Sequence, residues 1–263
     1  MVSLEIEISK TFKSFPDENE FHPQLAIDCI VFGYHEKQLK VLCTKMTGLS
    51  HLLLPGGYVN KNEDINEAAY RILRGRTGVH DLFLRQFGTF GKANQILISS
   101  EIGEALNRFP SATLMKMNWA ISKRFVSVGY YALVEYSRIQ ISTDRFSSQW
   151  VWQPVHQLQE MITQHSEMVA DAIKSLRREI HYEPIGMNLL PEKFTISELQ
   201  ALYETILKKK LDTRNFIKKL TSLDILKKTN EKGVFNKHRP PVLYKFNKRA
   251  YHKALKQEFE LIF

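Results

Sequence analysis

The sequence contains few cysteines. Among its 263 residues only Cys29 and Cys43 occur, and both lie in apolar runs that read as strands. Two cysteines offer no metal-ligand spacing, and a single possible pair argues against a secreted disulfide framework. We therefore expect two reduced thiols in the core and no metal bound by cysteine.

The sequence also lacks a long apolar stretch. No apolar run approaches the about 18 residues of a membrane span. The start, MVSLEIEISK, has no basic region followed by an apolar one. These absences favour a cytoplasmic protein without a membrane partner. A hydrophobic content of 43% still allows a substantial core, so we expect a folded globular chain.

The last segment of the chain has few acidic residues. Residues 184–263 contain 17 lysines and arginines against 8 aspartates and glutamates, whereas residues 1–183 contain 20 of each class. The formal net charge of +9 therefore belongs to the last segment. This asymmetry favours a segment that meets a polyanion, although a solvated lysine-rich surface would look the same. Two prolines and a glycine in YEPIGMNLLPEK mark the boundary, which predicts domains at 1–183 and 184–263.

The first of these domains alternates strands and helices. Residues 25–34 and 39–44 are rich in β-forming residues and flank the polar turn HEKQ, which suits a hairpin. Residues 125–136, FVSVGYYALVEY, are typical of a central strand. An amphipathic helix is expected to begin at Ser166. The pattern predicts a mixed α/β domain.

The second domain has its own helix and strand signals. Thr195 and Glu198 form a capping box that opens a helix to about Leu207, and Asp212 can cap a second helix over 213–222. Two β-prone runs, ILKKT and VLYKF, follow with a basic loop between them. Helix, turn, helix and a two-stranded ribbon are the order of a winged helix-turn-helix.

A degenerate motif lies inside the first domain, after the strands expected at 25–34 and 39–44. GGYVNKNEDINEAAYRILRGRTGV, residues 56–79, resembles the Nudix box. The glycine, glutamate, arginine and aliphatic positions of that box match at Gly57, Glu63, Arg71, Leu73, Gly78 and Val79. The resemblance implies an α+β chain in which a Nudix-like α/β/α sandwich with a mixed sheet precedes a winged helix-turn-helix.

Three glutamates of the box are absent, and Ile72, Gly75 and Arg76 stand in their place. Those glutamates bind divalent cations in the family, and hard cations require oxygen ligands. Isoleucine and glycine have no side-chain oxygen, and an arginine repels a cation. We therefore expect no metal, no cofactor and no catalytic residue, and we interpret Glu63 as a support for its loop.

The whole chain resembles the Nudix-related transcriptional regulators. The phrases EPIGMNLLPEKFTISELQALYETIL, LDTRNFIKKL and HRPPVLYKFN carry this resemblance more specifically than the box does. It is strongest for regulators of sugar utilisation of the arabinose type, whereas other members sense ADP-ribose. It implies a ligand-responsive bacterial regulator that binds operator DNA as a homodimer, with a sugar as effector or ADP-ribose as the alternative. Residues 91–122 depart from the family's usual short loop.

The resemblance also implies site residues. The second helix of the winged domain would enter the major groove, where Arg214 and Asn215 would read bases. The expected DNA-binding residues are Thr213, Arg214, Asn215, Lys218, Lys219, Lys232, Lys237, His238 and Arg239. The expected effector-binding residues are Asp28, Lys45, Tyr58, Arg71 and Tyr130.

Two other functions remain open from the sequence. One is a Nudix-type pyrophosphohydrolase that recruits acids outside the degenerate positions, such as Glu67, Glu101 or Glu104. The other is an RNA-binding adaptor, which is less favoured because the basic segment lacks an aromatic stacking surface.

Overall fold

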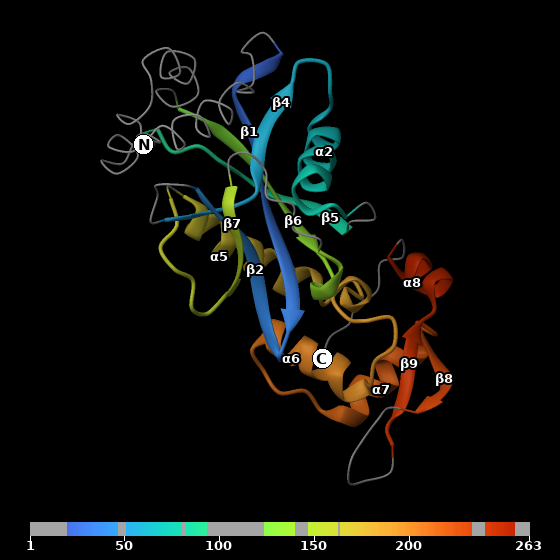
Figure 1. Ribbon diagram of the computed structural model, residues 1–263. Coiled ribbons are helices and arrows are strands. Elements are labelled where there is room, and N and C mark those ends of the chain that lie inside the picture. Colours follow the sequence, from blue (N-terminus) through green and yellow to red (C-terminus); the bar gives the residue numbers. More distant parts are fainter. Residues whose placement is uncertain are drawn as a thin grey trace. The chain divides into compact units, whose positions relative to one another are not determined.

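Two compact units make up the chain in the computed structural model, which describes residues 20–46, 51–79, 83–93, 124–139, 147–162, 164–232 and 240–255 (Figure 1). Unit 1 is drawn from residues 1–31, 41–132 and 139–172. Unit 2 is drawn from residues 32–40, 133–138 and 173–263. One division falls after Ala172, inside a helix, so the boundary expected between residues 183 and 184 stays a prediction.

A seven-stranded sheet has the order β3-β2-β1-β6-β5, with β4 paired to β1 and β7 paired to β2. The apolar run predicted at 25–34 forms the middle of β1, and Ile27, Cys29 and Phe32 in it are fully buried. Both cysteines are free and buried, which confirms the expected core thiols. The strands are β1 Phe21–His35, β2 Gln38–Met46, β3 Leu52–Leu53, β4 Gly56–Asn60, β5 Phe83–Phe90, β6 Val126–Leu133 and β7 Ser147–Pro154.

Helix α2, Ile65–Thr77, follows β4 and contains the arginines of the degenerate box. Its buried residues, which include Ala69 and Leu73, recur at helical spacing and so form one side of the helix. The helix ends at Gly78, whose φ of 69° is the left-handed conformation that glycine adopts without strain. The predicted amphipathic helix is also present as α5, His165–Glu179.

The winged helix-turn-helix fold is present in the C-terminal segment. Its core is aromatic, because Tyr203 packs edge-on against Phe216 at 5.3 Å and Phe246 packs against both Phe194 and Tyr251. Both predicted helix starts are confirmed, since Thr195 and Asp212 are the N-caps. The elements are η2 Gly186–Asn188, α6 Ile196–Leu207, α7 Thr213–Ser222, β8 Leu226–Lys232, β9 Val242–Phe246 and α8 Lys248–Ala254.

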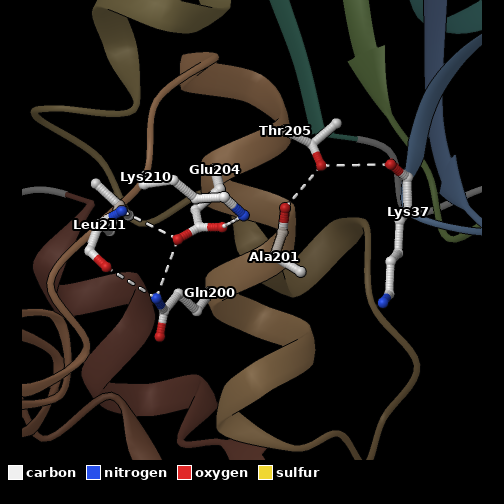
Figure 2. Close-up of polar contacts among 7 residues, drawn as sticks. All are labelled: Lys37, Gln200, Ala201, Glu204, Thr205, Lys210 and Leu211. Atoms are coloured by element: carbon white, nitrogen blue, oxygen red, sulfur yellow. Dashed lines mark hydrogen bonds and ion pairs between the residues drawn. The ribbon is translucent and has the colours of Figure 1, made fainter.

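Unit 2 also contains a piece of the sheet, namely the turn between β1 and β2. The Thr205 hydroxyl on α6 lies 3.4 Å from the carbonyl oxygen of Lys37 in this turn, as Figure 2 shows. The His35 ring stacks at 4.3 Å on Tyr136, at the start of the short helix η1, Tyr136–Arg138. The compact body around the winged helix is therefore larger than its own sequence segment.

Several expectations lie outside the described residues. Most of the departure at 91–122 and the wing residues Lys237, His238 and Arg239 belong to this group. Lys232 is described only as the last residue of β8. Across the described ranges, no helix is long and apolar enough to span a membrane.

Candidate effector and nucleic-acid sites

Glu63 holds the loop that precedes α2. Its Oε1 accepts a hydrogen bond from the Asn60 backbone N–H at 2.7 Å, and the Arg71 Nε donates to its Oε2 at 2.9 Å. A second Arg71 nitrogen donates to Glu63 and, at 2.8 Å, to the carbonyl oxygen of Tyr58. The hydrogen bond from Arg71 is the main reason that the pKa of Glu63 is lowered. Both carboxylate oxygens are engaged, as the loop-supporting interpretation expects.

The three positions without glutamate have different surroundings. Ile72 is buried, and a β-carbon added to Gly57 would come within 3.1 Å of its side chain. Gly75 has no neighbour within 4 Å of an added β-carbon. The Arg76 guanidinium is half-buried, 3.4 Å from the carbonyl oxygen of Gly56, and burial lowers its pKa. The degenerate box expected from the sequence therefore has a partly buried cation, Arg76, beside the Gly56 carbonyl.

The described residues contain no group of three His, Cys, Asp or Glu side chains that could hold a metal ion. Glu67, an acid considered for a hydrolase, accepts the Asp64 backbone N–H at 3.0 Å and so caps α2. Glu101 and Glu104 lie outside the described residues.

A partly buried acid and a buried histidine lie beside the box glycines. Asp28 on β1 pairs with Gly56 on β4, and a β-carbon at Gly56 would lie 2.5 Å from Asp28 Oδ1, so this approach requires glycine. The His165 Nδ1 accepts the Leu54 backbone N–H at 3.1 Å, which leaves the proton on Nε2, 3.6 Å from Asp28. Burial lowers the pKa of His165, while Asp28 opposes that shift. Sequence reasoning named Asp28 and missed His165.

The backbone explains how His165 reaches this place. Leu52 on β3 donates to the carbonyl oxygen of Glu160 at 3.0 Å, and Ile162 donates back to Leu52 at 3.1 Å. These bonds hold the segment before α5 beside β3. No local sequence signal marks such a pairing, because it depends on strand neighbours far apart in the chain.

The five expected effector residues have different surroundings. Burial is the first cause of the raised pKa of Tyr58 and Asp28 the second, and the Tyr58 carbonyl accepts a hydrogen bond from Arg71. Tyr130 is 2% exposed, and its hydroxyl donates to Asn66 and lies 3.3 Å from Gln86. Lys45 is half-buried on β2, opposite Leu52.

A cluster of polar contacts around Glu204 fixes the turn between α6 and α7 (Figure 2). The Glu204 carboxylate accepts the Leu211 backbone N–H at 3.0 Å, Lys210 Nζ at 2.9 Å and Gln200 Nε2 at 3.1 Å. These donors, led by the Leu211 N–H, lower the pKa of Glu204 to about 2. Gln200 also donates to the Leu211 carbonyl at 3.0 Å. The turn is therefore held from its preceding helix, just before the Asp212 cap.

Helix α7 buries one side and exposes a basic one. Phe216 and Leu220 are at most 1% exposed, and their packing fixes the helix against α6. The Asp212 side chain accepts the Asn215 backbone N–H at 2.9 Å, which sets the start of the helix. Four of the expected DNA-binding residues are exposed and Lys219 is half-buried; the exposed ones are Thr213, Arg214, Asn215 and Lys218.

The comparisons with known proteins agree with this architecture. Residues 186–246 match the model of the NrtR DNA-binding winged helix domain. The chain is 26% identical over 235 residues to the ADPR responsive transcriptional repressor NtrR of Acinetobacter baylyi. This alignment covers 87% of this chain and 84% of that protein.

Two solved structures show the same fold. The crystal structure of Shewanella oneidensis NrtR complexed with a 27mer DNA gives a TM-score of 0.67 at 24% identity, over 87% of this chain and 96% of that one. A MutT/nudix family protein from Enterococcus faecalis gives a TM-score of 0.59 at 19% identity, over 92% and 93%. None of these supports the expected closeness to arabinose-type regulators. The chain therefore combines a Nudix-like fold with a C-terminal winged helix domain.

Proposed function

We propose that this protein is an ADP-ribose-responsive transcriptional regulator that binds operator DNA as a dimer through its winged helix. The observation that carries the proposal is α7, an Asp212-capped helix with Arg214 and Lys218 exposed inside the segment that matches the NrtR DNA-binding domain. A major groove admits such a helix, and exposed arginine and lysine side chains suit base edges and phosphates.

ADP-ribose replaces the sugar as the proposed effector. The support is the relative from Acinetobacter baylyi, whose name describes an ADPR responsive repressor and which aligns with 87% of this chain. The Asp28 carboxylate, 14% exposed, suits a ligand that carries ribose hydroxyls, because a carboxylate accepts their hydrogen bonds.

Retention of the ligand follows from the degenerate box. Ile72, Gly75 and Arg76 supply no carboxylate, and Glu63 and Glu67, which precede them in the loop and first turn of α2, already accept hydrogen bonds from their own loop. A site without metal ligands can bind a diphosphate without hydrolysing it, as a sensor requires.

A thermal-shift measurement on the full chain tests the effector. ADP-ribose at 100 times its dissociation constant should stabilise the protein by about 2.7 kcal/mol, whereas L-arabinose should leave the melting temperature unchanged. Asp28→Asn should reduce the shift, and Glu192→Gln, an exposed carboxylate change in unit 2, should not. A shift with L-arabinose and none with ADP-ribose would return the sugar as effector.

DNA binding and hydrolysis are measured separately. Duplexes selected by the full chain from a randomised library should bind in fluorescence anisotropy, and ADP-ribose should change their affinity. Incubation of ADP-ribose with protein and magnesium should leave the ligand intact. Rapid cleavage that is lost in Glu67→Gln would instead support the hydrolase.

A further inference from the structure

One apolar side chain interrupts the polar surface of α7. Ile217 is 39% exposed, although the other large apolar residues of this helix, Phe216 and Leu220, are buried. It follows Arg214 by three residues, a spacing that makes two side chains neighbours on a helix, so the isoleucine lies beside an exposed arginine. Sequence reasoning about this helix did not single it out.

We propose that Ile217 is a specificity-determining residue that reads thymine in the major groove through its C5-methyl group. The proposal rests on the proposed function, in which α7 enters that groove. Thymine alone among the four bases presents a methyl group there, and apolar side chains recognise it by contact. An arginine such as Arg214 cannot make this distinction, because its donors recognise acceptor atoms.

Isoleucine suits this task for a conformational reason. Its branched β-carbon restricts the side chain in a helix largely to one rotamer, so the methyl groups are already placed before DNA binds. Ordering a flexible side chain would cost affinity, and a stiff one avoids most of that cost.

The charge around Ile217 suits a polyanion, which the proposed function identifies as duplex DNA. From Thr213 to Ser222 the helix contains Arg214, Lys218 and Lys219 and no aspartate or glutamate. An exposed isoleucine elsewhere on a protein needs no special explanation. Here Ile217 lies within the cationic face of α7, whose start is fixed by the polar contacts of Glu204. That cationic face complements a polyanion.

The spacing of the helix predicts where the thymine lies. Three residues along a helix advance about 4.5 Å, and successive bases of one strand are about 3.4 Å apart. The thymine read by Ile217 should therefore fall within about two base pairs of the base contacted by Arg214.

Deoxyuridine substitution tests the proposal, since it removes only the thymine methyl. The full chain selects duplexes from a randomised library, and each thymine of the selected site is then replaced singly by deoxyuridine. One replacement should weaken wild-type binding about three- to tenfold, as the loss of one buried methyl contact requires. Ile217→Ala should weaken binding to the thymine duplex by a similar factor and should no longer distinguish thymine from uracil.

Matched variants separate recognition from stability. Ile65→Ala removes an isoleucine of equal exposure, 38%, from α2 and should bind both duplexes like the wild type. Ile217→Val keeps a branched apolar side chain and should retain most of the thymine preference. The melting temperature of each variant shows whether the fold is intact.

Each outcome bears on a different claim. Equal losses on the thymine and uracil duplexes for Ile217→Ala, or wild-type discrimination in that variant, would overturn the assignment of Ile217 while leaving DNA binding in place. Failure of the wild type to select any duplex would overturn the proposed function itself, and the assignment with it.

Discussion

Helices α2 and α7 both follow an aspartate N-cap and both contain arginine, yet they direct their positive charge differently. On α2, Arg71 binds Glu63 and a backbone carbonyl, and Arg76 lies 3.4 Å from another carbonyl, so their guanidinium groups serve the fold locally. On α7, Arg214 and Lys218 are exposed and the helix has no carboxylate. The same residue type thus maintains a loop in one region and offers a binding face in the other.

The comparison depends first on the buried side that orients α7. Phe216 is fully buried against Tyr203, so Phe216→Ala should destabilise the protein by about 3–5 kcal/mol through lost contacts and a cavity. Urea titration of the variant beside the wild type measures this. A loss within about 0.5 kcal/mol, the range of an ordinary surface change, would show that the ring does not anchor the helix.

The second prediction removes the ion pair between Arg71 on α2 and Glu63. Glu63→Gln removes the negative partner of Arg71 while keeping the size of the side chain, and it should cost about 1–2 kcal/mol of stability. Affinity for DNA should not change, because the partner of Arg71 lies in the box loop. Denaturant melts and anisotropy on the same preparation check both parts. An equally large loss of DNA affinity would remove the contrast between the helices.

Much of this contrast could be predicted from the sequence. The caps Thr195 and Asp212 act through residues three positions on, so local spacing was sufficient to place α6 and α7. The interpretation of Ile72, Gly75 and Arg76 as replacements for the acids of the box stays a prediction.

Contacts between distant segments could not be predicted. His165 binds Leu54 across 111 residues, and the Lys37 turn meets Thr205 across 168. Such contacts depend on which strands become neighbours, and no local pattern encodes that. The exposure of Ile217, 39%, was not predicted from the sequence either.

A third prediction concerns acid, which should affect both regions through carboxylates of lowered pKa. Arg71 lowers the pKa of Glu63, and backbone and side-chain donors lower that of Glu204 to about 2. Their contribution to stability is therefore present above the usual glutamate pKa of about 4.3 and is lost as the pH falls below it, for Glu204 down to about 2.

Melting temperatures of wild type and Glu204→Gln between pH 7 and pH 2 measure this dependence. The difference between the two proteins should be largest near neutral pH and should shrink in acid. A difference that stays constant to pH 2 would mean that the charge of Glu204 does not hold the turn.

The smallest expected effect concerns a single phosphate contact. Lys219→Ala should weaken binding to selected and scrambled duplexes alike and reduce the slope of log affinity against log salt by about one, because one fewer counterion is released. Anisotropy at several salt concentrations measures the slope. An effect confined to the selected duplex would assign Lys219 to base recognition instead.

The central claim, that α7 reads bases, is tested most directly by the affinity of Arg214→Ala for the selected duplex and for its scrambled counterpart at one salt concentration. We expect a loss of about 1–3 kcal/mol on the selected duplex and a much smaller loss on the scrambled one, with relaxed preference at one base pair. Equal losses on both duplexes would contradict base reading by α7, since Arg214 would then contact only the phosphate backbone.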